Sequence, residues 1–349
     1  RDLIPTNTVD VSGRQVLSAL FYPLVDLDDK GTPVPAAAES VTPDGTGRVW
    51  TVRLKPGLTF GNGEAVTAGN YIDAWNYGAF GPNGQRGSSY FERIEGYADL
   101  QARDTDGAAG PQPAQDPQIS TLRGLRRVSD TAFTVTLSVP FAGWAALLNA
   151  AAFYPLPKAA FSAPGVIADG FENAVIGNGP FRMTGGWDRG SEIRMDKVAG
   201  FRGRAPRIDG VTFKIYRDLR AEYADLVDGR IDVQPQIPLA DLTAAADDLG
   251  DRLRRTADST FTFVGFPMYQ REFAKPEVRR ALSMAIDRRA MTDELFQGTE
   301  TPATAFVSPV VPGYRPDSCG DHCRYDPQRA RAMYAAAGGP RAVTISYNG

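Results

Sequence analysis

The feature that most constrains the fold is an irregular alternation of strand-like and helix-like segments, separated by turns rich in Gly and Pro. Residues 49–54 and 131–139 alternate apolar with polar side chains, as a strand buried on one face does. Apolar residues recur at helical spacing in residues 16–24, 221–228 and 277–296. Hairpin-like strand pairs interrupt the strand-to-helix order. The pattern therefore predicts mixed α/β lobes rather than one doubly wound sheet.

Further strand signals follow in the second half of the chain. Residues 193–197 and 211–216 are predicted as strands, and residues 261–266 as a buried strand. Residues 342–347 alternate β-branched with polar side chains just before the chain ends. A domain rarely stops where a strand has just formed, so we expect more chain to follow in the natural protein. The chain also begins without an initiator Met, as a mature or trimmed chain does.

Length and charge exclude two broad classes of partner. The chain has 349 residues, enough for two or three domains with cores of their own. Its formal net charge of −3 provides no basic field for a phosphate backbone. The densest basic run, Arg123, Arg126 and Arg127, is too small for a nucleic-acid groove. No stretch approaches the roughly 20 apolar residues that cross a bilayer. We expect neither a nucleic-acid partner nor a membrane-spanning segment.

Catalytic motifs are scarce. The sequence has one histidine, His322, which any Ser-His-Asp or Cys-His site would have to use. Gly177-Asn178-Gly179 is followed by Pro180, which lacks the amide hydrogen that a phosphate cradle needs. The carboxylate pairs Asp28-Asp29 and Asp247-Asp248 lie in polar surroundings, whereas a catalytic acid needs burial to raise its pKa. We therefore predict no enzyme and no cofactor, with a carboxylate-based hydrolase as a remote alternative.

The two cysteines, Cys319 and Cys323, lie in one loop rich in Gly, Asp and Pro. We favour a disulfide between them, which would be typical of an oxidising compartment. Free thiols are one alternative, and a metal site that includes His322 is another. The nearby sequence offers no complete tetrahedral ligand set, so we predict no metal.

Several aromatic residues are predicted at the ends of elements rather than within them. Such residues suit concave ligand sites, because they combine apolar area with a polar group. For any single one of them, packing in the core is the more common role. They are Tyr22, Tyr90, Trp144, Tyr154, Trp187 and Phe266.

Five segments, in this order, resemble one known family. Residues 20–25 (LFYPLV) and 35–40 (PAAAES) resemble the opening of family 5 extracellular solute-binding proteins. Residues 50–68 (WTVRLKPGLTFGNGEAVTA) resemble the family's tyrFxLRpGvkFhdGepltA stretch, with Gly-Asn where His-Asp is common. Residues 177–182 (GNGPFR) and 279–288 (RRALSMAIDR) resemble two later motifs. The family contains the peptide, oligopeptide and nickel receptors of ATP-driven importers.

The resemblance implies an α/β fold of the periplasmic-binding-protein type II kind, with two lobes and an additional small α/β domain. Residues 1–34 and 165–264 would form lobe I, with residues 35–164 inserted in it as the accessory domain. Residues 265–349 would start lobe II. Family members continue well beyond this length, so we expect the C-terminal part of lobe II to lie outside this chain.

The implied function is that of the substrate-binding receptor of an ABC importer, which captures peptides or oligopeptides between its lobes by hinge closure. The implied partners are the membrane permease subunits, and the receptor is expected to be a monomer. It would be extracellular, lipid-anchored at the cell surface, or periplasmic. An oligosaccharide, a metal chelate or another small solute is the alternative ligand.

The resemblance also implies ligand-binding positions. Tyr22-Pro23-Leu24 would be the peptide-contacting segment after the first helix, and Tyr90 would be an aromatic residue of the cleft. Phe266 would lie where the chain crosses between lobes. The carboxylate that commonly holds a peptide's amino terminus belongs to the family's later part and has no counterpart in these residues.

Overall fold

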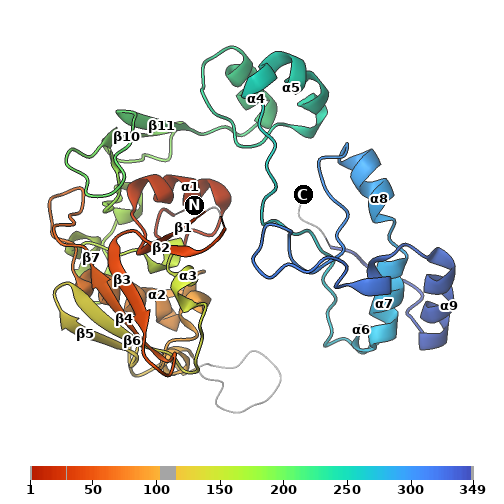
Figure 1. The fold of residues 1–349 in the computed structure, drawn as a ribbon, viewed down its shortest axis with the longest axis horizontal. Coiled ribbons are helices and arrows are strands. Elements are labelled where there is room, and N and C mark those ends of the chain that lie inside the picture. Colours follow the sequence, from red (N-terminus) through yellow and green to blue (C-terminus); the bar gives the residue numbers. More distant parts are fainter. Residues whose placement is uncertain (1, 29, 103–114, 347–349) are drawn as a thin grey trace. The chain divides into compact units, whose positions relative to one another are not determined.

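The structure, a computed structural model, describes residues 2–28, 30–102 and 115–346 (Figure 1). The chain divides into two compact units, Arg1–Ile215 (unit 1) and Tyr216–Gly349 (unit 2). The elements of unit 1 are α1 (Val11–Leu20), β1 (Val25–Leu27), β2 (Pro33–Pro35), β3 (Ala38–Pro43), β4 (Val49–Leu54), α2 (Ala68–Ala79), β5 (Leu125–Ser129), β6 (Ala132–Thr136), α3 (Trp144–Leu147), β7 (Phe161–Ala163), β8 (Val166–Ile167), β9 (Phe181–Met183), β10 (Glu192–Lys197) and β11 (Gly210–Lys214). Those of unit 2 are α4 (Leu219–Val227), α5 (Leu242–Leu249), α6 (Arg271–Ala274), α7 (Pro276–Met284), α8 (Arg288–Ala290), a π-helical turn (Met291–Leu295) and α9 (Pro327–Ala337).

A four-stranded antiparallel sheet in the order β3-β4-β6-β5 forms the largest sheet of unit 1. Alternation along β4 buries Trp50, Val52 and Leu54, as the apolar and polar pattern predicts. Helix α2 contributes Tyr71 and Trp75, whose rings lie 5.8 and 5.5 Å from that of Phe133 on β6. These aromatic residues form the centre of the core of unit 1.

Side-chain caps define the starts of helices α2 and α1. Thr67 and Asn70 form a capping box, in which the backbone N–H of Thr67 donates to Oδ1 of Asn70 over 2.8 Å. Helix α1 has its own cap, because Oδ1 of Asp10 accepts from the N–H of Gly13 over 2.9 Å. Helix α1 ends at Leu20, within the segment 16–24 that has helical spacing in the sequence.

The end of α1 is held by the segment Gly177-Asn178-Gly179. The N–H of Gly179 donates to the carbonyl oxygen of Leu20 over 2.8 Å. The Asn178 side chain accepts from the N–H of Tyr22 over 3.0 Å and donates to its carbonyl oxygen over 3.3 Å. A Cβ atom on Gly177 would lie 1.9 Å from the Leu20 oxygen, so only glycine allows the two segments to meet this closely.

One continuous core joins three consecutive segments of unit 1, which are residues 1–34, 35–164 and 165–215. It includes Leu20 from the first, Trp75 from the second and Met195 from the third. The third segment carries the sheet β11-β10-β9, which confirms the strands predicted at residues 193–197 and 211–216. The domain boundaries expected at 34/35, 164/165 and 264/265 stay predictions, because the division into units at 215/216 does not test them.

Unit 2 is helical, and its described residues contain no strand. Helices α4 and α5 enclose a small core of Tyr223, Leu226, Ala245 and Leu249. The hydroxyl of Tyr223 donates to the Asp248 carboxylate over 2.8 Å. Helices α7 and α9 pack on each other.

Two strand predictions in unit 2 are wrong. Residues 261–266 do not form a buried strand, and the side chain of Phe263 is 73% exposed. Residues 342–346 are also outside any strand, and Tyr347 lies outside the described residues. A strand needs a neighbouring strand to pair its N–H and C=O groups, and the described part of unit 2 provides none.

The long helix predicted over residues 277–296 is divided in the structure. Helix α7 ends at Met284, and α8 starts after Asp287. The Asp287 carboxylate accepts from the N–H of Ala290 over 3.0 Å, which makes Asp287 the cap of a new helix. A side chain that caps a helix start favours a boundary at this point rather than a continuous helix.

We predict that Gly177→Ala destabilises unit 1, because the added Cβ atom would collide with the backbone of Leu20. The free energy of unfolding should fall by ~1–3 kcal/mol, the usual cost of overpacking a well-packed site. Chemical denaturation followed by tryptophan fluorescence measures this change. Gly45→Ala is the matched control, since its Cβ atom would meet nothing within 4 Å. Equal stability of the two variants would contradict the prediction.

Candidate ligand-binding site

Unit 1 has a groove of about 360 Å³ at the start of α1. This volume lies within the usual range of small-molecule sites, which begins at roughly 300 Å³. The walls come from the segment before α1, from α1 itself, from the turn around residue 90 and from residues 149–154. The lining residues are Pro5, Thr6, Thr8, Val9, Arg14, Ser18, Gly87, Tyr90, Asn149, Ala150, Ala151, Ala152 and Tyr154.

Contacts between Thr6 and the segment 85–87 set the shape of the groove. The N–H of Gly87 donates to the carbonyl oxygen of Thr6 over 2.8 Å. The Thr6 hydroxyl donates to Oε1 of Gln85, also over 2.8 Å, and this bond is buried. A Cβ atom on Gly87 would lie 2.7 Å from the Thr6 oxygen, so glycine is needed for this approach. The turn that follows carries Tyr90.

Two tyrosines form the aromatic walls. The ring of Tyr90 meets buried Phe153 edge-on at 6.1 Å and is itself 40% exposed. The ring of Tyr154 stacks on Phe21 at 5.2 Å. Burial, with a smaller effect of Asp26, raises the pKa of Tyr154 to about 12, so its hydroxyl keeps its proton at neutral pH. Both rings rest on core residues, which makes the walls rigid.

The polar groups of the groove are spread over two of its sides. Arg14 and Ser18 lie one helical turn apart on the exposed side of α1. Asn149 also lines the groove, although it is far from them in sequence, and its side-chain amide donates to the carbonyl oxygen of Val25 over 3.2 Å. Arg14 is the charged residue of the lining. The groove combines apolar area, hydroxyl groups and one cation.

A second hollow of about 240 Å³ also includes Tyr90 in its lining. Its other lining residues are Ser89, Glu92, Arg93 and Leu147. The guanidinium of Arg93 lies over the ring of Phe141, 4.3 Å from its centroid. Tyr90 therefore contributes to both concave surfaces of this region.

Of the five ligand-binding residues expected from the sequence, the groove includes Tyr90. Tyr22 and Leu24 lie beyond the other end of α1: the Tyr22 ring packs edge-on against Phe201 at 5.2 Å, and the Leu24 side chain is fully buried. Pro23 is half-buried between them. Phe266 belongs to unit 2, where its ring lies 5.9 Å from that of Phe273. Contacts of all five residues with a ligand stay predictions.

The remaining aromatic residues at element ends have different roles. Trp144 is fully buried beside Trp50, and the Trp187 ring lies 5.1 Å from the Arg189 guanidinium. Tyr154 lines the groove, as an aromatic residue at an element end can. The residues that sequence reasoning missed are Thr8, Val9, Arg14, Ser18 and Asn149. In the sequence, these residues differ from others only in lying near the start of a capped helix or beside the run of small residues at 150–152.

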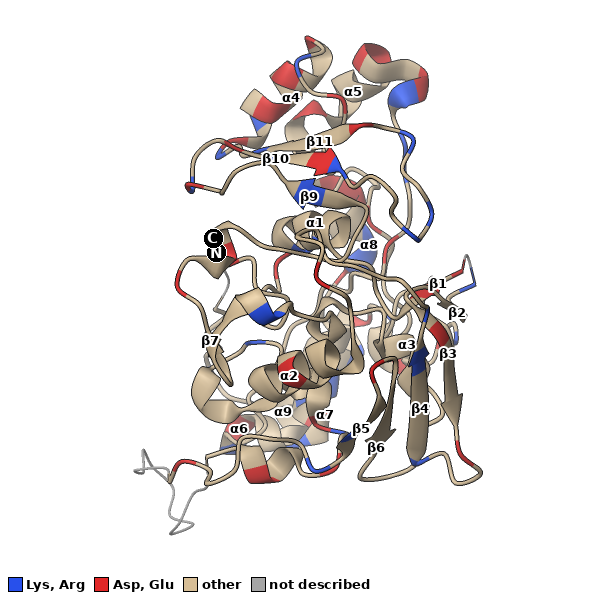
Figure 2. Cartoon of the chain, turned by 90° about the vertical axis from the view of Figure 1, so that its left-hand side faces the viewer, with Lys and Arg blue, Asp and Glu red and all other residues tan. Residues whose placement is uncertain are grey.

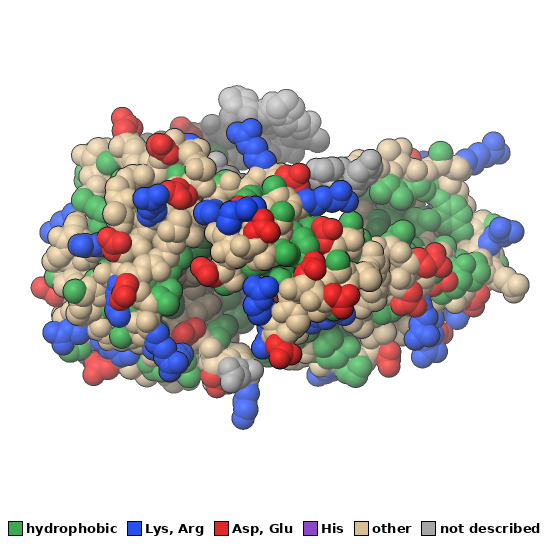
Figure 3. All heavy atoms as spheres, turned by 90° about the horizontal axis from the view of Figure 1, so that it is seen from above, with side chains coloured by type: hydrophobic (Ala, Val, Ile, Leu, Met, Phe, Trp, Pro, Cys, Tyr) green, Lys and Arg blue, Asp and Glu red, His purple; other side chains and the backbone are tan. Residues whose placement is uncertain are grey.

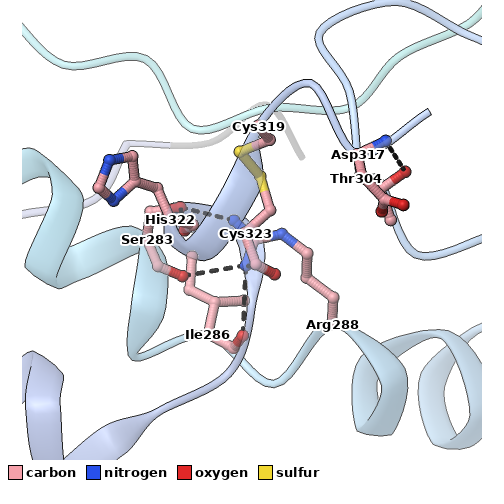
Figure 4. The surroundings of a disulfide bond; sticks show 8 residues. All are labelled: Ser283, Ile286, Arg288, Thr304, Asp317, Cys319, His322 and Cys323. Carbon is pink, nitrogen blue, oxygen red and sulfur yellow. Dashed lines mark hydrogen bonds between the residues drawn. A yellow bond between two sulfur atoms is a disulfide. The ribbon is translucent and has the colours of Figure 1, made fainter. Parts of the chain in front are cut away.

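Cys319 and Cys323 form a disulfide in unit 2 (Figure 4). The loop that they close is attached to the end of α7. The Ser283 hydroxyl donates to the carbonyl oxygen of His322 over 2.7 Å. Arg288 donates to Oγ of Ser283 over 2.8 Å and to the carbonyl oxygen of Cys323 over 3.4 Å. The disulfide therefore stabilises a loop that packs on helix α7.

Charge is distributed without a dominant sign. Figure 2 shows Lys and Arg interspersed with Asp and Glu along the elements, and the face in Figure 3 carries both signs side by side. Within residues 2–28, 30–102 and 115–346, no group of three or more His, Cys, Asp or Glu could hold a metal ion. In the same described ranges, no helix has the length and apolar character that crossing a membrane requires.

The sequence match places the chain in a family. Residues 32–347 match the bacterial extracellular solute-binding proteins, family 5 Middle. The chain therefore belongs to this family of solute-binding proteins, as its five motifs indicate.

Comparison with individual proteins shows the extent of the similarity. The chain is 25% identical over 348 residues to the glutathione-binding protein GsiB of Escherichia coli K12, covering 99% of this chain and 60% of that protein. The murein tripeptide binding protein MppA of Escherichia coli superposes with a TM-score of 0.76 at 22% identity, over 97% of this chain and 64% of MppA. The oligopeptide-binding protein AppA of Bacillus subtilis, solved with a nonapeptide, gives a TM-score of 0.72 at 22% identity, over 97% and 62% of the two chains.

These likenesses confirm the predicted fold class, that of the periplasmic-binding-protein type II-like proteins. The chain spans less than two thirds of the length of the relatives it matches.

We predict that replacing both Cys319 and Cys323 with Ser lowers the free energy of unfolding of unit 2 by ~2 kcal/mol. The reason is that a disulfide across a short loop restricts the unfolded chain. Thermal unfolding with and without a reducing agent measures the effect. The reducing agent should destabilise the original protein and leave the double variant unchanged. A shift of the same size in both proteins would contradict this role of the disulfide.

Proposed function

We propose that this protein is the substrate-binding receptor of an ABC importer, which captures peptides or oligopeptides without covalent chemistry. The observation that carries the proposal is family membership over residues 32–347, together with a groove walled by Tyr90 and Tyr154. GsiB binds glutathione, MppA a murein tripeptide and AppA a nonapeptide, by their descriptions. All three ligands are peptide-like, and their range of sizes is typical of recognition through the peptide backbone.

The groove supports this function in physical terms. Its aromatic rings provide flat apolar contact area at a low cost in side-chain entropy. Pro5, Thr8 and Val9 bring non-helical backbone to one wall, where a ligand backbone could pair. Small side chains at 150–152 leave space for ligand side chains of different sizes. A site of this kind binds many peptides with moderate preference.

The two alternatives to a peptide receptor are a receptor for another class of solute and a hydrolase. An oligosaccharide, a metal chelate or another small solute would use the same fold. An oligosaccharide site would usually be lined with Trp and Asn; the groove has Asn149 but its aromatic residues are tyrosines. A carboxylate-based hydrolase would need paired carboxylates, and among the described residues the lining of the groove contains no Asp or Glu. Peptides therefore remain the favoured ligand.

The wider role of the protein follows from the same proposal. A receptor of this kind delivers its ligand to permease subunits in the membrane and acts as a monomer outside the cytoplasm, either periplasmic or lipid-anchored at the cell surface. The disulfide between Cys319 and Cys323 supports an oxidising compartment. Both the lipid anchor and the monomeric state belong to this proposal.

We predict that short peptides raise the melting temperature of the intact protein. A ligand present at 100 times its Kd adds about 2.7 kcal/mol to the stability of the folded state. Differential scanning fluorimetry with a panel of di- to nonapeptides measures this shift. Glycosides and chelated metals serve as the comparison panels. A shift with either of these and none with any peptide would reject peptides as the ligand.

We predict that Tyr90→Ala weakens peptide binding about tenfold, which corresponds to about 1.4 kcal/mol. Loss of the ring removes contact area from both concave surfaces that it lines. Isothermal titration calorimetry with the best peptide of the panel gives the Kd. Tyr325→Ala is the control, because Tyr325 is exposed in unit 2 and lines neither hollow. An unchanged Kd for Tyr90→Ala would show that the Tyr90 ring does not contribute to peptide binding.

A further inference from the structure

The groove at the start of α1 contains a cation, Arg14, that has no ion-pair partner among the residues that the structure describes. Arg14 lies in the first turn and a half of α1, with an exposed side chain. Among the described residues, its guanidinium forms no ion pair and no hydrogen bond. A guanidinium has five N–H donors in a planar arrangement that matches a carboxylate. Arg14 can therefore offer two parallel hydrogen bonds to a bound anion.

Nearby carboxylates have other partners. Asp10 lies one helical turn before Arg14, and its carboxylate accepts from the N–H of Gly13 as the cap of α1. The Asp26 carboxylate accepts from the N–H of Leu27 over 2.9 Å and from the Asn149 amide over 3.5 Å. Among the described residues, the lining contains Arg14 and no Asp, Glu or Lys. Arg14 is therefore the charged group of the described lining, and the carboxylates of Asp10 and Asp26 are bonded to other groups.

The other polar groups of the lining add donors. Ser18 lies one turn further along the same side of α1, and Tyr154 is also a lining residue of the groove. The Tyr154 hydroxyl is protonated at neutral pH, because burial raises its pKa to about 12. Hydroxyl donors and a guanidinium together stabilise an anion better than they stabilise an ammonium group. The chemistry of the groove therefore favours a ligand that carries a carboxylate here.

We propose that Arg14 binds a carboxylate of the captured solute and so makes the receptor selective for ligands that are anionic at this position. This inference rests on the proposed function, because it names the chemical class of ligand for the same groove. The carboxylate has two possible sources in a peptide, its C-terminus or an acidic side chain. Both have the same geometry and charge, so the guanidinium would bind either.

Four matched peptides distinguish these sources. They are Ala-Ala-Ala, its C-terminal amide, Ala-Glu-Ala amide and Ala-Gln-Ala amide. Isothermal titration calorimetry of the intact protein gives a Kd for each one. We expect one carboxylate peptide to bind about tenfold more tightly than its neutral partner, as a charge-assisted hydrogen bond would give. The difference should shrink between ~50 and ~500 mM NaCl, because salt screens exposed charges.

Variants test whether Arg14 causes this preference. Arg14→Gln keeps a long polar side chain and removes the charge, so it should weaken binding of the carboxylate peptide and abolish the difference between the two members of its pair. Arg14→Lys keeps the charge and loses the two-donor geometry, so it should retain part of the preference. Arg126→Gln is the matched control, since Arg126 lies exposed on β5 and outside the groove. Circular dichroism checks that each variant is folded.

The outcomes separate this inference from the proposed function. If the peptides bind and each carboxylate peptide equals its neutral partner, the Arg14 inference is wrong and the receptor function stands. The inference is also wrong if Arg14→Gln weakens neutral and anionic peptides equally. If none of the four peptides and no member of the di- to nonapeptide panel binds, the peptide receptor and the inference both fail. A preference for Ala-Ala-Ala over its amide assigns the C-terminus, and a preference within the Glu and Gln pair assigns the side chain.

Discussion

The close approach between Gly177-Asn178-Gly179 and the end of α1 is the contact on which the arrangement of unit 1 depends. Two glycines let the segment reach the Leu20 carbonyl oxygen, and the Asn178 side chain pairs both backbone groups of Tyr22. The N–H of Gly61 also donates to the Gly177 carbonyl oxygen over 2.8 Å. Three segments far apart in sequence therefore meet through backbone groups, which side-chain substitutions elsewhere cannot replace. Burying these polar groups is tolerated because each one named here has a partner.

This contact has a consequence at the opposite end of the same helix. Helix α1 is held at its end by Gly179 and at its start by the Asp10 cap. The residues before it are held by the bond from Gly87 to Thr6. A helix restrained at both ends presents the same exposed side to the groove at all times. The backbone of Arg14 is therefore held by contacts at both ends of α1, which suits a preformed ligand site.

Local patterns predicted the elements of unit 1 well, because each element there has its structural reason nearby in sequence. Alternation of apolar and polar residues identified β4 and β6. The same reasoning failed at residues 261–266, since strand formation depends on a partner that periodicity cannot reveal. The segment Gly177-Asn178-Gly179 could be recognised as part of a family-like motif. The sequence could not show that a Cβ atom on Gly177 would collide with the carbonyl oxygen of Leu20, because that contact joins distant parts of the chain.

The site was less predictable than the fold, and the residues show why. Tyr90 could be proposed because it is an aromatic residue at a predicted element end and because the family resemblance implies an aromatic residue of the cleft at this position. Val9 and Asn149 have no such signal, because their role comes from lining one groove although they are far apart in sequence. Arg14 is one of many arginines in an arginine-rich chain. Its distinction is the lack of a counter-charge among the described residues, which becomes visible only when every neighbouring carboxylate is placed.

A receptor that binds through the ligand backbone gains affinity from any peptide and therefore little selectivity. One unpaired guanidinium changes this balance, because its interaction depends on whether the ligand brings a carboxylate to one position. Selectivity is a difference between two affinities, and a neutral ligand at this position would leave the cation unpaired as water is excluded. The groove would then penalise neutral ligands as well as favouring anionic ones. A single residue on a rigid helix can in this way set the ligand class of an otherwise permissive site.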